Sequence, residues 1–213
     1  MSICPFLGEV DIKKTAIILS GGKSSRMGQD KECLKYNGIY LMDTIIYKLK
    51  KSFDEIVIVT NNPSIYDDKK RQILKDVLIT TDIIKNKGPC VGLYSGLTVS
   101  SNEDNFLLAC DMPYINNDYI NYLLDMSYKN ALVYKNNKYF EPFCAMYKKD
   151  LIYRLKEFID EDQRSLNKFL STIEPDIIDN SIIESFDKEK KMFTNINYPE
   201  EWQAFIGEYY END

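Results

Sequence analysis

A glycine-rich loop with several cationic residues directly follows a short apolar segment near the N-terminus. The loop, residues 19–31, reads LSGGKSSRMGQDK and comes after the apolar triplet AII. Gly21 and Gly22 lack Cβ atoms, so backbone N–H groups there can approach an anion. Arg26 and Lys31 add positive charge. Phosphate binding is one interpretation, and an ordinary glycine turn with solvated charges is the alternative for a bare Gly-Gly pair.

Two common phosphate-binding motifs are absent from this loop. A P-loop requires a glycine at position 17, which is Ile17 and belongs to the apolar segment. No Gly-x-Gly-x-x-Gly fingerprint of dinucleotide-binding proteins occurs either. Any phosphate site built on this loop must therefore be of another type.

Two aspartates follow apolar segments farther along the chain. Asp111 comes after residues 106–110 and two residues before Pro113, and Asp82 comes after residues 77–81. A lone carboxylate at the end of a strand suits Mg²⁺, which takes oxygen ligands and shares them with substrate phosphates. A turn or helix-capping role is the alternative for Asp111.

Composition excludes several kinds of chemistry. The chain of 213 residues has no histidine, so Ser-His pairs, Cys-His pairs and His-ligated metals are excluded. Its five cysteines include no Cys-x-x-Cys pair, which predicts neither a disulfide framework nor a structural zinc site. The net charge of −6 argues against nucleic-acid binding. Without a long apolar run, we expect a cytoplasmic protein that does not contact the membrane.

The pattern of apolar segments predicts an α/β fold. Short segments rich in Ile, Val and Leu indicate buried strands at residues 16–20, 55–60, 77–81 and 106–110. Helix-like segments lie between them at residues 41–49, 64–74 and 93–100. This alternation predicts one domain, residues 1–213, with three α/β/α layers and a mostly parallel, Rossmann-like sheet. Residues 1–14 are expected to form a flexible extension.

The second half of the chain has a mixed pattern. Asn116 or Asn117 is placed to cap a helix, and residues 131–134 and 139–147 flank Asn136-Asn137 like a hairpin. Three more helices are predicted, after Asp150, over residues 164–170 and from Pro199 onward.

The complete loop resembles the signature of the nucleotidyltransferases with a glycosyltransferase-A-like fold, the nucleotide-diphospho-sugar transferase type. Its Asp30-Lys31 pair is most similar to the MobA-type molybdenum cofactor guanylyltransferases, although Ser20 stands where that family usually has alanine. The resemblance continues in GPCVGL (88–93), ACDMP (109–113) and FTNINYPEE (193–201). It covers about residues 15–205.

This resemblance implies an enzyme that transfers GMP from GTP to molybdopterin or Mo-molybdopterin and releases pyrophosphate. Arg26, Lys31 and Asp111 would be catalytic, with Asp111 holding Mg²⁺. The nucleotide site would comprise Leu19, Ser20, Gly21, Gly22, Lys31, Asn61, Asp82, Gly88 and Asp111. Residues 15–115 would form the nucleotide-binding half and residues 116–213 the acceptor-binding half. Accessory Mo-cofactor proteins and apo-molybdoenzymes are the further partners implied.

Several assignments remain open. Asp82 is expected to contact either the guanine base or a ribose hydroxyl, and the neighbours of Asn61 are alternatives to it. Asn195 and Asn197 are expected near the pterin or the metal, although Asn197 also fits the N-cap of the last helix. Arg164 is a candidate for the acceptor phosphate. A cytidylyltransferase acting on molybdopterin or on a sugar or isoprenoid phosphate, a sugar-nucleotide glycosyltransferase and a non-catalytic nucleotide-binding module are the alternative functions.

Overall fold

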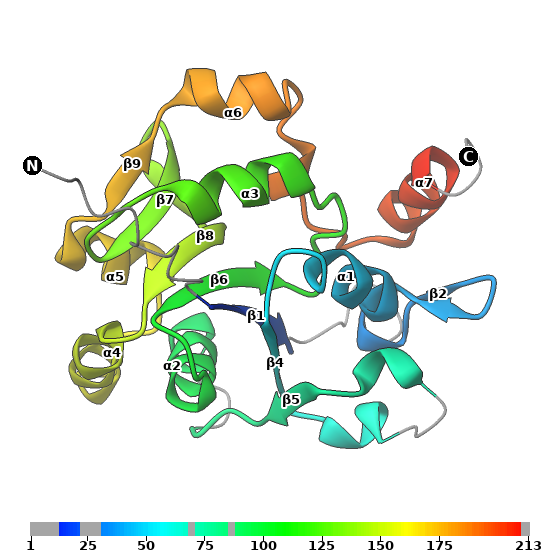
Figure 1. The fold of residues 1–213 in the computed structure, drawn as a ribbon, viewed down its shortest axis with the longest axis horizontal. Coiled ribbons are helices and arrows are strands. Elements are labelled where there is room, and N and C mark those ends of the chain that lie inside the picture. The colour runs from blue at the N-terminus through cyan, green and yellow to red at the C-terminus, as the bar shows by residue number, and fades with distance from the viewer. Residues whose placement is uncertain (1–12, 22–30, 68–70, 85–87, 210–213) are drawn as a thin grey trace, which may run out of the picture.

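A seven-stranded mixed sheet forms the centre of the protein (Figure 1). The computed structural model describes residues 13–21, 31–67, 71–84 and 88–209. The strands lie in the order β5-β4-β1-β6-β8-β7-β9. Their bounds are β1 Lys14–Ser20, β4 Glu55–Thr60, β5 Val77–Thr80, β6 Asp104–Ala109, β7 Ala131–Asn136, β8 Tyr139–Lys148 and β9 Asp176–Ile178. The first four in this order are parallel, whereas β8 is antiparallel to both of its neighbours.

The register of the parallel strands divides their side chains between two hydrophobic cores. Ile17 lies beside Val57 and Leu107, and all three belong to one core. The next residue of each strand belongs to the other core. Successive side chains of a strand point to opposite faces, so strands covered on both sides require the continuous apolar segments that the sequence shows.

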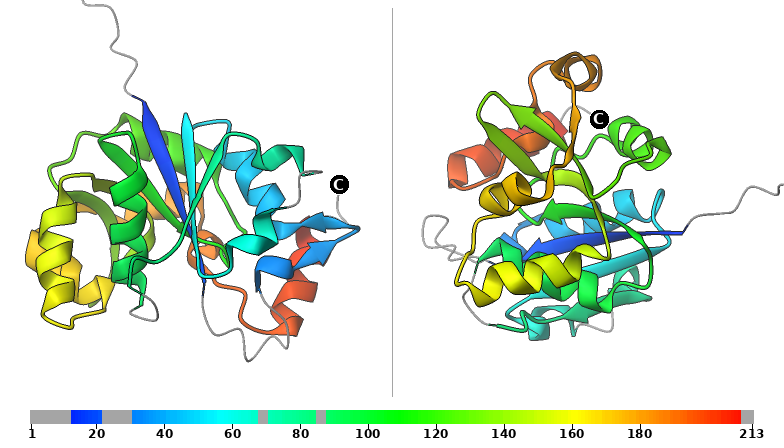
Figure 2. Two further views of the ribbon diagram at one scale, coloured as in Figure 1. Left: turned by 90° about the horizontal axis from the view of Figure 1, so that it is seen from below. Right: turned by 90° about the vertical axis from the view of Figure 1, so that its left-hand side faces the viewer.

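Helices cover both faces of the sheet (Figure 2), and the expected three-layer α/β architecture is confirmed. One face is covered by α2 Pro89–Val99, α4 Leu151–Asp160 and α5 Leu166–Ile173. The other is covered by α1 Leu41–Leu49, α3 Asn117–Asp125, α6 Asn180–Phe186 and α7 Pro199–Tyr209. Short elements complete the fold: the strands β2 Lys35–Tyr36 and β3 Ile39–Tyr40, and the 3-10 helices η1 Lys31–Cys33, η2 Pro63–Tyr66, η3 Gln72–Leu74 and η4 Lys191–Phe193.

Local signals placed several elements correctly. Asn116 caps α3 by accepting a hydrogen bond from the backbone N–H of Tyr119 at 3.0 Å. The hairpin between β7 and β8 turns at Asn137, whose φ of +54° is in the left-handed region that asparagine tolerates. The helix predicted over residues 164–170 begins two residues later, because Ser165 is its N-cap.

The single helix predicted over residues 64–74 is wrong. The described part of this segment forms η2 and η3 instead. Arg71 has non-helical backbone angles, and its guanidinium bonds to Asp43 on α1 and to the carbonyl of Ile65. These tertiary contacts outweigh the helical pattern of the segment.

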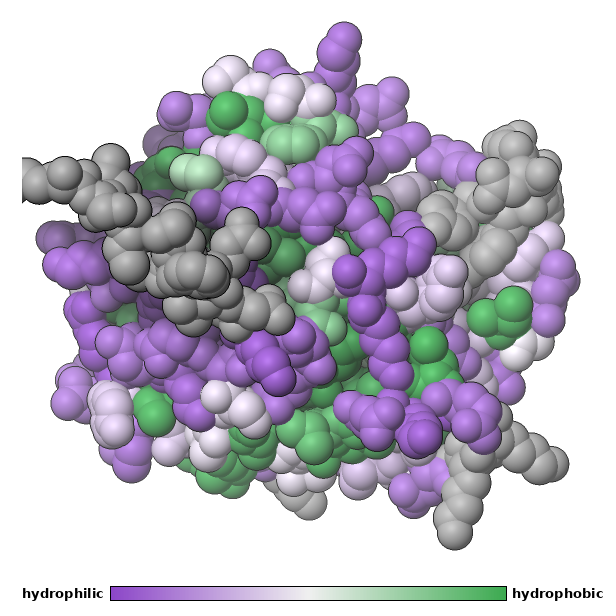
Figure 3. Space-filling model, in the orientation of Figure 1, coloured by the Kyte–Doolittle hydropathy of each residue, from purple (hydrophilic) through white to green (hydrophobic). Residues whose placement is uncertain are grey.

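The chain ends and the surface complete the description. Lys14 is the first residue of β1, so the ordered sheet begins inside the predicted extension 1–14, whose first twelve residues lie outside the described part. Hydrophilic residues cover most of the face shown in Figure 3, with smaller apolar areas between them. Among the described residues, no helix is both long and apolar enough to cross a bilayer.

Candidate functional site

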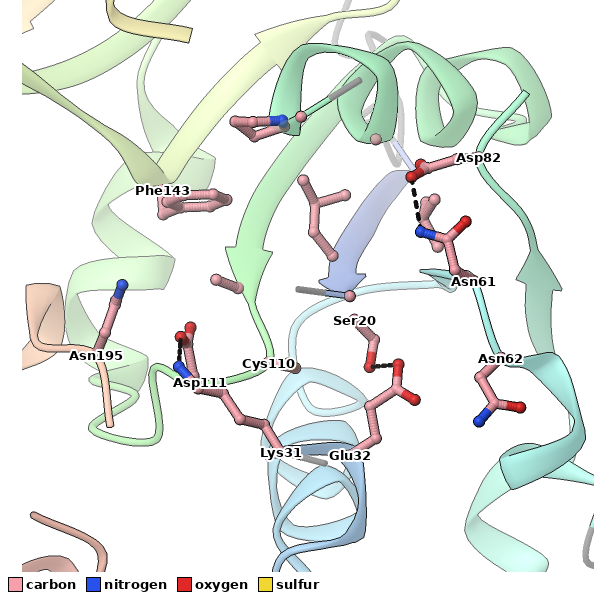
Figure 4. A pocket seen from close by; sticks show the side chains of 17 residues that line it. Ser20, Lys31, Glu32, Asn61, Asn62, Asp82, Cys110, Asp111, Phe143 and Asn195 are labelled. Atoms are coloured by element: carbon pink, nitrogen blue, oxygen red, sulfur yellow. Dashed lines mark hydrogen bonds and ion pairs between the residues drawn. The ribbon is translucent and has the colours of Figure 1, made fainter. Parts of the chain in front are cut away.

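A pocket of about 850 Å³ opens where β1, β4 and β6 end (Figure 4). This edge of a parallel sheet is where ligands of α/β proteins commonly bind. The pocket is lined by Leu19, Ser20, Gly21, Lys31, Glu32, Val59, Asn61, Asn62, Asp82, Gly88, Pro89, Gly92, Ala109, Cys110, Asp111, Phe143 and Asn195. Every described residue that the sequence assigned to catalysis or nucleotide binding is among them. Gly22 and Arg26 lie outside the described residues.

Lys31 connects three segments that are far apart in the sequence. Its Nζ donates to Asp111 Oδ2 at 2.6 Å and to Asn197 Oδ1 at 2.7 Å. The side chains of Lys31 and Asp111 are 16% and 14% exposed, so the ion pair is largely shielded from water. The backbone carbonyl of Asp111 also accepts from the N–H of Ile196 at 2.7 Å, which attaches the segment before α7 to the end of β6.

Asn197 does not use its side chain to cap α7. The N–H groups of Asn197 and Tyr198 both donate to Glu201 Oε2, at 2.6 and 3.0 Å. Because α7 begins at Pro199, Tyr198 rather than Asn197 directly precedes the helix, and the amide oxygen of Asn197 accepts from Lys31. The capping alternative for Asn197 is therefore wrong.

A second polar pair lies on the β4 side of the pocket. Asn61 Nδ2 donates to Asp82 Oδ2 at 3.1 Å (Figure 4). Burial raises the pKa of Asp82 above that of a free aspartate, and the hydrogen bond from Asn61 opposes this shift. Asn62 also lines the pocket, but its side chain accepts from the hydroxyl of Ser64. The pairing with Asp82 thus distinguishes Asn61 from its neighbour.

Glycines let α2 begin at the pocket and pack closely on β1. Gly88 precedes the helix with a φ of +79°, a conformation that other L residues rarely adopt. A Cβ atom on Gly92 would lie only 2.9 Å from Leu19 Cδ1. The motif GPCVGL therefore places the N-terminal end of α2 beside the end of β1.

Phe143 reaches the pocket because β8 is irregular, a feature that the sequence analysis did not anticipate. Glu141 pairs with Tyr134 but Met146 pairs with Leu132, so the residues between them bulge out of the ladder. Cys144, inside this bulge, has a φ of +53°. Pro142 is the local signal for the irregularity, because proline within a sheet favours edges and bulges.

Arg164, a sequence candidate, and Cys110, which was not one, both lie near the strand ends of this region. Arg164 forms an ion pair with Asp162 at 3.0 Å, about half exposed, and is not among the residues that line the pocket. Cys110 lines the pocket, but burial raises the pKa of its thiol to about 12. At neutral pH this thiol is protonated and is not a nucleophile.

The donors in the pocket fit a hard divalent cation that is shared with a ligand. Among the described residues, no three His, Cys, Asp or Glu side chains gather into a metal-binding cluster. Asp111 would hold the cation through carboxylate oxygen, and substrate phosphates and water would complete its coordination, as is usual for Mg²⁺.

Comparisons with known proteins identify the family and the fold of the chain. Residues 16–176 match the family described as the MobA-like NTP transferase domain. The chain is 36% identical over 199 residues to a "probable molybdenum cofactor guanylyltransferase" of Peptoclostridium acidaminophilum, covering 90% of this chain and 87% of that protein. It is 33% identical over 194 residues to the molybdenum cofactor guanylyltransferase of Syntrophotalea carbinolica, covering 90% of each protein. Its fold is similar to that of molybdopterin-guanine dinucleotide biosynthesis protein A from Archaeoglobus fulgidus, with a TM-score of 0.69, 23% identity and coverage of 89% and 95%.

Proposed function

Because the chain belongs to the family of MobA-like NTP transferases, we propose that it transfers GMP from GTP to molybdopterin. The products are molybdopterin guanine dinucleotide and pyrophosphate. The relatives that carry the name molybdenum cofactor guanylyltransferase align with nearly the whole chain, which supports this activity over the cytidylyl and non-catalytic alternatives. In the pocket, the observation that carries the proposal is the position of Lys31 between Asp111 and Asn197.

The reaction needs positioning and charge neutralisation more than covalent catalysis. The terminal phosphate oxygen of molybdopterin attacks the α-phosphorus of GTP in line, and the bond to the β-phosphate breaks. Lys31, together with Arg26, would offset the negative charge that develops on the triphosphate. The attacking phosphate is already an anion at neutral pH, so the chain needs no histidine as a general base.

Asp111 would hold Mg²⁺ together with phosphate oxygens of GTP. The bound cation would supply positive charge to the triphosphate. Lys31 pairs with the same carboxylate at 2.6 Å, so Lys31 and the cation would both bind Asp111.

Asp82 is the proposed recognition group for the guanosine part of GTP. Its carboxylate can accept from both the N1–H and the N2–H₂ groups of guanine. The bond from Asn61 orients it toward the pocket, and Leu19, Ser20, Gly21, Gly22 and Gly88 would complete the nucleotide site.

We also propose that residues 15–115 bind the nucleotide and residues 116–213 bind the acceptor. The division is supported by the pocket lining, in which Phe143 and Asn195 come from the second half. Use of GTP favours the cytoplasm as the location of the reaction. Accessory Mo-cofactor proteins and apo-molybdoenzymes are the proposed partners for delivery of substrate and product.

The test is incubation of the purified chain with GTP, Mg²⁺ and molybdopterin-loaded protein, followed by assays of pyrophosphate and of GMP released from the product by acid hydrolysis. Pyrophosphate formation that depends on molybdopterin, with GTP preferred over the other three nucleotides, would support the proposal. A clear preference for CTP would refute the assignment of the base. The Asp111→Asn variant serves as the negative control, and full transfer by this variant would refute the metal role of Asp111.

A further inference from the structure

A buried carboxylate at the ends of β1 and β4, that of Glu32, has no role in the chemistry described above. Glu32 Oε1 accepts one hydrogen bond from Ser20 Oγ and one from Thr60 Oγ1, each at 2.7 Å. Ser20 Oγ also lies 2.7 Å from the hydroxyl oxygen of Tyr66. All four residues are at most 9% exposed. A buried charge is costly unless it is well hydrogen-bonded, so this arrangement requires a reason.

The directions of these hydrogen bonds follow from the number of protons. Ser20 has one hydroxyl proton and donates it to Glu32, so the hydroxyl of Tyr66 must be the donor to Ser20. Thr60 donates to Glu32 and accepts from the backbone N–H of Asn62 at 3.0 Å. Two chains of hydrogen bonds therefore end on one carboxylate oxygen, and both depend on it.

The network joins four segments around the pocket. Ser20 ends β1 and Thr60 ends β4, and these two residues lie opposite each other in the parallel register. Glu32 belongs to η1 and Tyr66 to η2. A 3-10 helix of three residues has little stability of its own, so the position of η1 must come from tertiary contacts of this kind.

We propose that Glu32 is a positioning residue, which fixes η1 against the ends of β1 and β4 so that Lys31 reaches Asp111 and Asn197. The hydroxyl of Ser20, where the resembling family usually has alanine, is the matching donor in this chain. Glu32 acts through Lys31 and need not contact the substrate. The kinetic part of its test rests on the transferase activity proposed above.

The main test compares Glu32→Ala with a matched control at the opposite end of the same two strands. Glu55 Oε1 accepts from Thr15 Oγ1 and from the N–H of Ser101, each at 2.8 Å. We expect Glu32→Ala to lower kcat at least tenfold, whereas Glu55→Ala leaves kcat within twofold. A drop of less than threefold for Glu32→Ala, or an equal drop for both variants, overturns the proposal.

A double-mutant cycle separates positioning from a general structural role. If Glu32 acts through Lys31, adding Glu32→Ala to Lys31→Met should lower kcat by less than threefold further. If the loss of kcat in the double variant equals the product of the losses in the two single variants, the proposal is overturned. Glu32→Gln retains an acceptor oxygen of the same reach and should keep kcat within about threefold of the wild type. If Glu32→Ala does not fold, Tyr66→Phe replaces it in the same cycle, with the same criterion.

A second readout does not depend on the transferase reaction. The acetylation rate of the Lys31 amine by limiting acetic anhydride can be measured by peptide mass spectrometry. We expect it to rise at least threefold in Glu32→Ala and to stay unchanged in Glu55→Ala. An unchanged rate in Glu32→Ala refutes positioning even if the enzyme proves to have another activity. If wild-type turnover is absent but the labelling rises as expected, only the proposed function fails.

Discussion

Replacement of Lys31 by methionine should have opposite effects on metal binding and on turnover. In the structure, the ammonium of Lys31 occupies Asp111 Oδ2 at 2.6 Å, where a divalent cation would also bind. A charge-assisted hydrogen bond contributes about 1.5–3 kcal/mol. Because both side chains retain some exposure, we take the lower end, about 1.5 kcal/mol, which corresponds to roughly a tenfold change in an equilibrium constant.

The Lys31→Met variant should therefore bind Mn²⁺, a spectroscopic substitute for Mg²⁺, about tenfold more tightly than the wild type when nucleotide is absent. Electron paramagnetic resonance of free Mn²⁺ measures this affinity. Turnover should fall by about 10²–10³, the range seen when a donor that stabilises developing charge is removed. The pyrophosphate-release assay measures this loss.

Lys148→Met is the matched control for this prediction. Lys148 Nζ lies 2.6 Å from Asp104 Oδ1, with 23% and 11% exposure of the two side chains, at the opposite end of β6. The control should leave Mn²⁺ affinity and turnover unchanged. Equal or weaker Mn²⁺ binding by Lys31→Met would refute the competition for Asp111, and turnover within threefold of the wild type would refute the catalytic role of Lys31.

Three further predictions concern recognition, pH dependence and packing. ITP lacks the 2-amino group of GTP, so the wild type should prefer GTP about tenfold in kcat/KM, and Asp82→Asn should reduce this ratio to about one. A ratio unchanged by Asp82→Asn would instead favour a ribose contact. Asn61→Ala should raise the pKa of Asp82 further, because it removes the hydrogen bond that opposes the shift. A protonated carboxyl group loses acceptor capacity, so on acidification the KM for GTP should begin to increase at a higher pH in this variant than in the wild type. A pH profile of KM identical to that of the wild type would contradict this. Gly96→Ala places a Cβ 2.5 Å from Ile17 Cγ2 and should destabilise the fold by about 1–3 kcal/mol in urea unfolding, and an unchanged midpoint would show that α2 adjusts freely.

Much of the parallel part of the fold was predictable because burial on both faces leaves a strong signal. Segment 55–60 contains few polar residues, and the structure places a largely buried strand there. The strand predicted at 77–81 is also present, as β5, but its predicted burial is wrong, because β5 lies at the edge of the sheet and Leu78 is 44% exposed. The turn at Asn37-Gly38 between β2 and β3 was missed in the sequence. Both residues have positive φ values in the structure, of 49° and 83°. Its strands have only two residues each, too short for a periodic pattern.

The antiparallel edge of the sheet was less predictable. The strand β9 has three residues, of which one is buried, so it shows no hydrophobic run. The bulge in β8 depends on how Pro142 and Cys144 fit between two neighbouring strands, and no local pattern specifies that fit. Phe143 was therefore not identified as part of the pocket wall.

For the site, sequence motifs identified the side chains that come directly after strands but not the contacts between them. Asp111 and Asp82 follow strands, and parallel strands bring their carboxyl ends to one edge. The hydrogen bond from Lys31 to Asn197 joins segments that are 166 residues apart, so it becomes visible only in three dimensions. Glu32 was missed because a glutamate beside a catalytic candidate has no distinguishing pattern until its hydroxyl partners are located.

The charges on the pocket wall also indicate the form in which the nucleotide binds. Among the lining residues that the structure describes, Glu32, Asp82 and Asp111 are carboxylates and Lys31 is the cation. Since Lys31 is already paired with Asp111, this part of the wall repels a free triphosphate. We therefore expect the nucleotide to bind as its Mg²⁺ complex, with Arg26 adding positive charge from the loop. In that complex the ammonium of Lys31, which the ion pair with Asp111 holds at the pocket wall, would lie within reach of phosphate oxygens.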